Sequence, residues 1–156
     1  MPDPYSDGIV AILQSSLKLH LSQWEAYEGQ ANHFERWGYP QLAKIWFSYA
    51  KEERGHARMV LERLEFYDAT PDMSHDAIVW PRHDFEGVLD SNYEGDRQAA
   101  KVERDGYAAC NEAGDASGAA IFRELLKGSE DSMANIEAIR RVIEQIGLDN
   151  YLANKV

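Results

Sequence analysis

Apolar residues recur at alternating steps of three and four along four long segments of this chain. That spacing keeps side chains on one face of an α-helix and packs them against neighbouring helices. Glycine and proline separate the segments, and residues 67–84 hold two prolines and no helical pattern, as expected of a long connection. The sequence therefore predicts an all-α four-helix bundle as one domain over residues 1–156, with helices at about 6–37, 39–67, 84–111 and 115–146 and a short helix at 148–154.

Each of the four apolar stripes is interrupted by polar residues near the middle of its helix. Glu53 and His56, in the stretch "AKEERGHARM", stand three apart and so point in nearly the same direction from one helix. Buried charges are costly unless they are paired or bind a metal. Antiparallel packing would bring the interruptions to similar heights in the bundle, which indicates a polar layer suited to a metal ion. The interrupting residues are His20, Glu53, His56, Asp96, Ser129 and Ser132.

Composition excludes several classes of protein. Asp and Glu number 27 against 16 Lys and Arg, a net charge of −11 that disfavours nucleic acid and suits a protein that gathers cations. The N-terminal "MPDPYSDG" lacks the features of a signal peptide, and no apolar stretch approaches the ~20 residues of a membrane span. The single cysteine, Cys110, cannot form an intrachain disulfide. We expect a cytoplasmic protein without membrane or nucleic-acid partners.

The stretch "RWGYPQLAKIWFSYAKEERGHARMVLERLEFYDATPD" and the C-terminal "IEQIGLDNYLANK" resemble the ferritin-like superfamily, and within it the bacterioferritins. The pair Glu53/His56 resembles the first ExxH motif of that family. The resemblance implies a ferritin-like bundle with a long crossover after the second helix. It also implies a 24-subunit shell that oxidises Fe(II) and stores the ferric mineral at a di-iron site.

Carried over by position, the family's ligands are only partly present. The glutamate of the first helix falls on His20, that of the third falls on Asp96, and the second ExxH motif falls on Ser129 and Ser132. The methionine that binds haem in bacterioferritins is replaced by Arg54, so we expect no haem.

What remains are the metal ligands His20, Glu53 and His56, a set that resembles the facial triad of mononuclear iron sites, with Asp96 as a fourth ligand or a bridge. The two serines are expected to fill space. Glu103 and Glu130 are expected on the flank of the bundle or in solvent. A metal-free alternative stays open, in which His20–Glu53 and His56–Asp96 form buried ion pairs.

These observations predict a metal-binding protein with an iron storage or oxidation role and a partly lost ferroxidase site, active as an oxidoreductase only if that site works. One or two irons per subunit, or another divalent transition metal, are expected. One alternative is an enzyme with a mononuclear non-haem metal. Another is a structural shell subunit that assembles with an intact paralogue, instead of a homo-oligomer.

Overall fold

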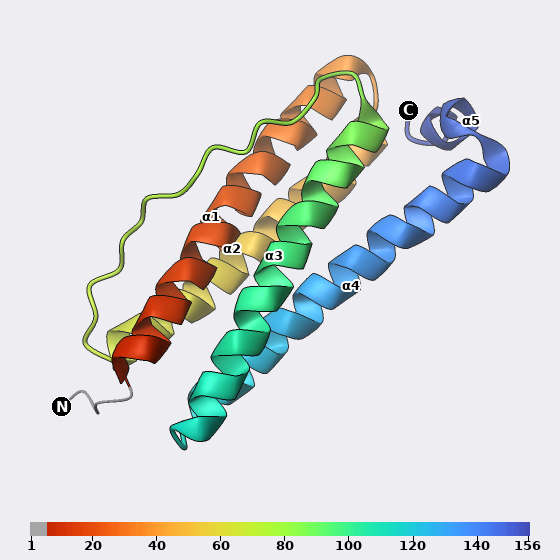
Figure 1. The fold of residues 1–156 in the computed structure, drawn as a ribbon. Helices are drawn as coiled ribbons and strands as arrows, with labels where there is room; N and C mark the ends of the chain where they lie inside the picture. Colours follow the sequence, from red (N-terminus) through yellow and green to blue (C-terminus); the bar gives the residue numbers. More distant parts are fainter. Residues whose placement is uncertain (1–5) are drawn as a thin grey trace.

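The computed structural model describes residues 6–156, which are helical apart from the connections between helices and residues 154–156. It confirms the predicted all-α fold class, a four-helix bundle with a long connection after the second helix and a short C-terminal helix (Figure 1). Of the single domain predicted over residues 1–156, residues 1–5 lie outside the described part. The helices are α1 (Ser6–Trp37), α2 (Pro40–Phe66), α3 (Phe85–Glu112), α4 (Ala116–Ile146) and α5 (Leu148–Ala153).

Local chemistry explains where the helices begin. Pro40 lies in the first turn of α2, where its fixed φ suits the helix and its missing N–H leaves no bond unmade. Asp84 caps α3 by accepting from the backbone N–H of Gly87, at 2.9 Å. Asp115 caps α4 in the same way through Gly118, also at 2.9 Å. Aspartate is among the residues preferred at this position, because its side-chain oxygen accepts from a backbone N–H that the helix leaves free.

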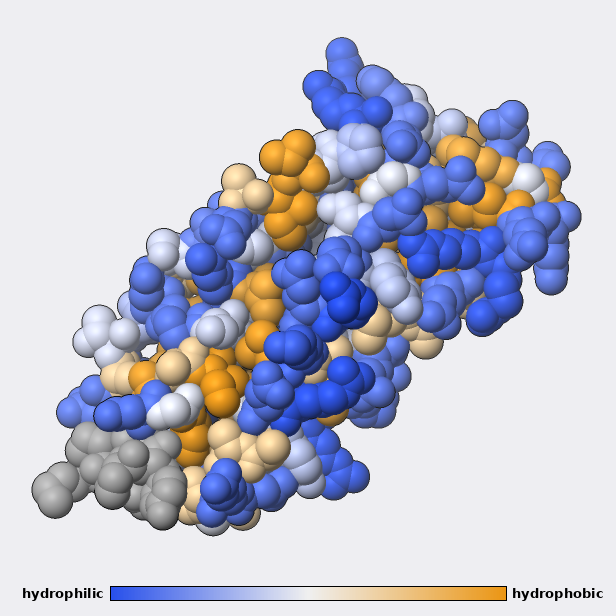
Figure 2. All heavy atoms as spheres, viewed as in Figure 1, coloured by the Kyte–Doolittle hydropathy of each residue, from blue (hydrophilic) through white to orange (hydrophobic). Residues whose placement is uncertain are grey.

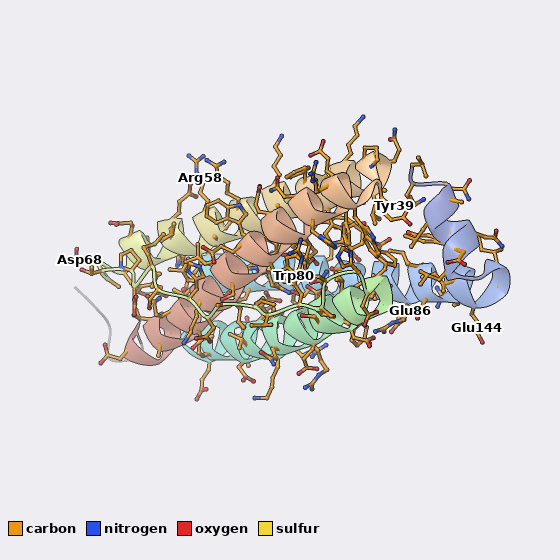
Figure 3. The ribbon with its side chains drawn as sticks, turned by 90° about the horizontal axis from the view of Figure 1, so that it is seen from above. Tyr39, Arg58, Asp68, Trp80, Glu86 and Glu144 are labelled. Carbon is orange, nitrogen blue, oxygen red and sulfur yellow. The ribbon has the colours of Figure 1, made fainter. Side chains whose placement is uncertain are left out.

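The helices form two antiparallel hairpins, α1–α2 and α3–α4, joined by a connection that runs the length of the bundle (Figure 1). Trp80 anchors this connection on α1, where a Cβ on Gly29 would lie 3.3 Å from its ring. In the view of Figure 3, Trp80 lies against the bundle, whereas Arg58 of α2 points away from it. The long connection lets α3 start at the same end as α2 and then run antiparallel to both α1 and α4.

Within residues 6–156, the core consists of two hydrophobic clusters, one toward each end of the bundle. One cluster includes Trp46, Phe34 and Phe85 and extends to α5, where Phe85 stacks on Tyr151 with ring centroids 5.7 Å apart. The other includes Leu17 and Phe122. On α2, α3 and α4 the polar residues of the stripes lie between the members of the two clusters along the sequence. On α1, His20 lies next to Leu21, the last member of the second cluster on that helix, so the site sits near the middle of the bundle.

Three buried side chains, two amides and an indole, form hydrogen bonds that connect three helices within the first cluster. Gln30 and Asn92 each donate to the other's side-chain oxygen, at 3.0 and 2.9 Å, and Trp46 donates to Gln30 at 2.9 Å. All three side chains are buried. Because these bonds form at one relative height only, they fix how α1, α2 and α3 are aligned along the bundle.

Most of the face shown in Figure 2 is hydrophilic, and hydrophobic groups reach it in separate places. Among residues 6–156, we find no helix with the length and hydrophobicity needed to cross a membrane.

Candidate metal centre

His20 on α1 lies between two carboxylates. Its Nδ1 is 2.6 Å from Oε2 of Glu53 on α2, and its Nε2 is 2.9 Å from Oε1 of Glu103 on α3. His20 is 1% exposed and Glu103 is 0% exposed, so the three groups interact with little screening by water.

With a carboxylate at each ring nitrogen, both nitrogens are placed to donate, which is the pattern of an imidazolium. Burial by itself lowers the pKa of His20, but the charge of Glu53 and hydrogen bonds to Glu103 and Glu53 raise it to about 10. Burial raises the pKa of Glu53, but the charge of His20, its hydrogen bond to Glu53 and the nearby His56 together lower that pKa to about 2. Without a metal ion, His20 is therefore protonated, and the His20–Glu53 pair expected in the metal-free alternative is present.

His56 completes a group of three possible ligands. Its Nδ1 lies 3.6 Å from the same Oε2 of Glu53, and one ligand atom from each of His20, Glu53 and His56 lies within 4.8 Å of the other two. The Nδ1 of His56 is buried and has no hydrogen-bond partner among the described residues. A buried nitrogen that makes no hydrogen bond, next to a carboxylate and a second imidazole, fits a divalent transition metal, which would supply the missing partner.

Gly128 of α4 makes room for this imidazole. A Cβ at Gly128 would lie 3.1 Å from Cε1 and 3.3 Å from Nε2 of His56. A side chain at position 128 would therefore press on the ring, which makes the glycine part of how the site is built.

Asp96 on α3 lies apart from that three-residue group. Its carboxylate accepts from Ser132 at 2.6 Å and from Gln23 at 3.1 Å. The His56–Asp96 pair of the metal-free alternative is therefore replaced by these two neutral donors. Burial raises the pKa of Asp96 to about 7, and the nearby charge of Glu53 adds to the effect.

Glu103 is the site residue that sequence reasoning missed. We expected it on the flank of the bundle, but it is completely buried and bonded to His20. The available signal was its spacing of seven residues from Asp96, two helical turns along the same stripe. Glu130, in contrast, is exposed as expected.

The two serines of α4 do more than fill space. Ser129 donates to Oε2 of Glu103 at 2.9 Å, and Ser132 donates to Asp96. Each serine thus satisfies one buried carboxylate of α3 with a neutral donor, where a histidine or glutamate would add a ligand.

A pocket of about 320 Å³ opens between α2 and α4 and reaches Glu53 and His56. Ser132 and Gly128 line its α4 side, and Tyr27 reaches it from α1. The exposed carboxylates Glu52 and Asp131 also line it. The side of the site that faces α4 is therefore open to small molecules and attractive to cations.

Arg54, at the position of the family's haem-binding methionine, is exposed, and its guanidinium carbon lies 5.8 Å from the ring centroid of Trp24. A guanidinium has no lone pair to give to iron. This residue therefore does not fit haem.

Comparison with known proteins agrees with the fold. The family model described as "Ferritin: Ferritin-like domain" matches residues 10–146. The chain is 23% identical to the bacterial ferritin of Synechocystis sp. over 150 residues, which are 96% of each chain. It is 24% identical to the bacterioferritin of Brucella melitensis, over 92% of this chain and 89% of that one. It is 25% identical to the bacterial ferritin of Pseudomonas aeruginosa, over 95% of this chain and 96% of that one.

Proposed function

We propose an iron-binding and iron-storage role for this chain, which belongs to the ferritin-like domain family. Its relatives over nearly their full lengths are named bacterial ferritin and bacterioferritin. The acidic composition and the carboxylates around the pocket support a protein that attracts cations.

We infer that the site holds one divalent transition metal through His20, Glu53 and His56. Asp96 would join as a further carboxylate ligand by giving up its bond from Ser132 or from Gln23. The observation that carries this proposal is the buried Nδ1 of His56, which makes no hydrogen bond among residues 6–156 and lies within the ligand group beside the carboxylate of Glu53. Two imidazoles and one or two carboxylates suit Fe(II), Zn(II) or Mn(II).

A single ion follows from what α4 offers. Ser129 and Ser132 stand where the family has its second ExxH motif, and their hydroxyls already serve Glu103 and Asp96. A hydroxyl is a weak ligand for a second ion. Oxidation of Fe(II) by a di-iron route is therefore disfavoured, and any ferroxidase activity of this subunit should be slow.

A structural shell subunit with a degenerate site is the competing function. The observation that favours it is the ion pairing of His20, whose two nitrogens already face carboxylates without a metal. Such a subunit would depend on an intact paralogue for iron oxidation.

Metal analysis separates these functions. The purified chain is loaded with Fe(II) without oxygen, freed of unbound metal by gel filtration, and measured by elemental analysis. One iron per subunit supports the mononuclear site. Two irons would support a di-iron site instead, and no iron would support the structural subunit. His56→Ala is the matched control, because it removes the unpaired nitrogen from a half-buried position.

We also propose a closed homo-oligomer, most simply the 24-subunit shell of the family, in the cytoplasm, where the free buried thiol of Cys110 would remain reduced. Light scattering coupled to size-exclusion chromatography tests the assembly. A monomer or a simple dimer at micromolar concentration would contradict it, and intact mass spectrometry of cell-purified material would reveal a paralogous subunit.

A further inference from the structure

Glu103 is a buried carboxylate that the proposed ligand set leaves without a role. Its side chain is 0% exposed. Its Oε1 faces Nε2 of His20 at 2.9 Å, and its Oε2 accepts from Ser129 at 2.9 Å. Both oxygens are therefore engaged, one by the proposed ligand and the other by α4.

The two nitrogens of His20 have different neighbours and would have different roles in the metal site. Nδ1 is 2.6 Å from the Glu53 oxygen that also lies 3.6 Å from His56, so this edge of the ring faces the other proposed ligands. Nε2 faces only Glu103 among the polar groups of the described residues that bond to this ring. A histidine that gives one nitrogen to a metal keeps its proton on the other, and a hydrogen-bond acceptor there fixes both the tautomer and the orientation of the ring.

We propose that Glu103 is a positioning residue for the metal site: it accepts the Nε2–H bond of His20 and thereby holds Nδ1 toward the metal with its lone pair free. Ser129 holds Glu103 in turn, so that the chain Ser129–Glu103–His20 runs from α4 through α3 to α1. This inference rests on the proposed metal site. It also gives a reason why position 129 on α4 is a serine where the family has a glutamate, because a small hydrogen-bond donor there keeps Glu103 in place.

Two substitutions isolate this role. Glu103→Leu has nearly the same volume but removes the acceptor, and Glu103→Gln keeps an oxygen acceptor while removing the charge. Exposed Glu112, at the end of the same helix, supplies the matched control Glu112→Gln. This substitution changes the net charge by the same amount as Glu103→Gln but lies far from His20. Outer carboxylate partners of metal-bound histidines typically contribute 10- to 100-fold in affinity.

Co(II) is the probe, and its affinity for the full-length chain is measured by competition with a chromophoric chelator. We expect Glu103→Leu to bind about 100-fold more weakly, Glu103→Gln about 10-fold more weakly, and Glu112→Gln like the wild type. If Leu fails to fold, the Gln variant still decides. Wild-type affinity in both Glu103 variants would overturn the inference, whereas absence of Co(II) binding by the wild type would overturn the proposed metal site itself.

Proton NMR of the Co(II) form in water adds a readout that a merely structural role would not move. The Nε2–H of a bound, buried His20 should give a shifted, exchangeable signal in the wild type and Glu103→Gln, and the signal should vanish or exchange rapidly in Glu103→Leu. An unchanged signal in Glu103→Leu would contradict the proposed bond. A change in the number or position of the visible Co(II) absorption bands in Glu103→Gln would make Glu103 a direct ligand and also contradict a positioning role.

Discussion

Ser132 on α4 donates a 2.6 Å hydrogen bond to Oδ2 of Asp96 on α3, and the same arrangement recurs seven residues along α3, where Ser129 donates to Glu103. The two bonds stabilise buried carboxylates without adding charge to the layer. On this side of the site, α4 therefore donates hydrogen bonds to the carboxylates of α3, whereas the two imidazoles come from α1 and α2.

The ligand set can be tested by removing one imidazole and one hydroxyl. His56→Ala deletes the nitrogen that lacks a partner among the described residues, so we expect at least about 100-fold weaker metal binding, beyond the effect of an outer partner. Ser132→Ala should change affinity by no more than a few-fold, because Ser132 bonds to Asp96 and lies outside the three-residue group. Chelator competition with Zn(II) measures both. Equal affinities for His56→Ala and the wild type would remove His56 from the site.

Restoring the family's second motif should restore a second metal. In Ser129→Glu/Ser132→His, the new imidazole can use the pocket lined by position 132, and the new carboxylate lies beside Glu103. Without metal, this additional buried charge should lower the melting temperature. With Fe(II), we expect stoichiometry to rise toward two per subunit and Fe(II) oxidation to accelerate. Calorimetry, elemental analysis and stopped-flow absorbance measure the three effects, and a stoichiometry that stays at one would show that the α4 side cannot hold an ion.

The buried hydrogen-bonded cluster of Gln30, Asn92 and Trp46 should contribute strongly to stability. Gln30→Leu leaves the Asn92 amide and the Trp46 N–H without their Gln30 partner inside the core, at an expected cost of about 3 kcal/mol in the free energy of unfolding.

Adding Asn92→Leu to that variant removes the orphaned amide, and we expect the double variant to recover about 1 kcal/mol. Urea denaturation followed by circular dichroism gives both values. Additive losses in the double variant would mean that the two amides do not act as a pair.

Acid sensitivity should depend on Asp115, which accepts from Arg63 and Tyr67 at the end of α2 and caps α4. Burial alone would raise the pKa of Asp115, but hydrogen bonds from Arg63 and Tyr67 lower it from 3.8 to about 2. Because the pKa is lower in the folded state, the stabilisation is present above about pH 4 and is lost as the pH falls toward 2.

Asp115→Asn keeps a capping side chain but not the charge, and should cost about 2 kcal/mol at pH 7. That difference from the wild type should shrink toward zero near pH 2, measured by urea denaturation across the pH range. The exposed Asp105→Asn serves as the control. A difference that is constant with pH would show that the charge of Asp115 is not responsible.

The sequence by itself determined the fold class and that the site lies in the interior of the bundle. Steps of three and four put Leu13, Leu17 and His20 on one face of one helix, and they require helices that bury this face against each other. Proline and a capping aspartate start two of the helices by local rules, as Pro40 and Asp115 show. Polar interruptions of the stripes placed His20, Glu53 and His56 in the interior, and the structure gathers these three.

Only the tertiary structure decided which polar group faces which. Asp96 shares the layer but bonds to Ser132 and Gln23, and Glu103, which we expected on the flank, faces His20. Periodicity gives the face of a helix to within part of a turn. A hydrogen bond also depends on how each helix is rotated and shifted against its neighbours. Those rotations are set by packing along the whole bundle, including contacts between helices outside the site such as Gln30 with Asn92, and no local pattern encodes them.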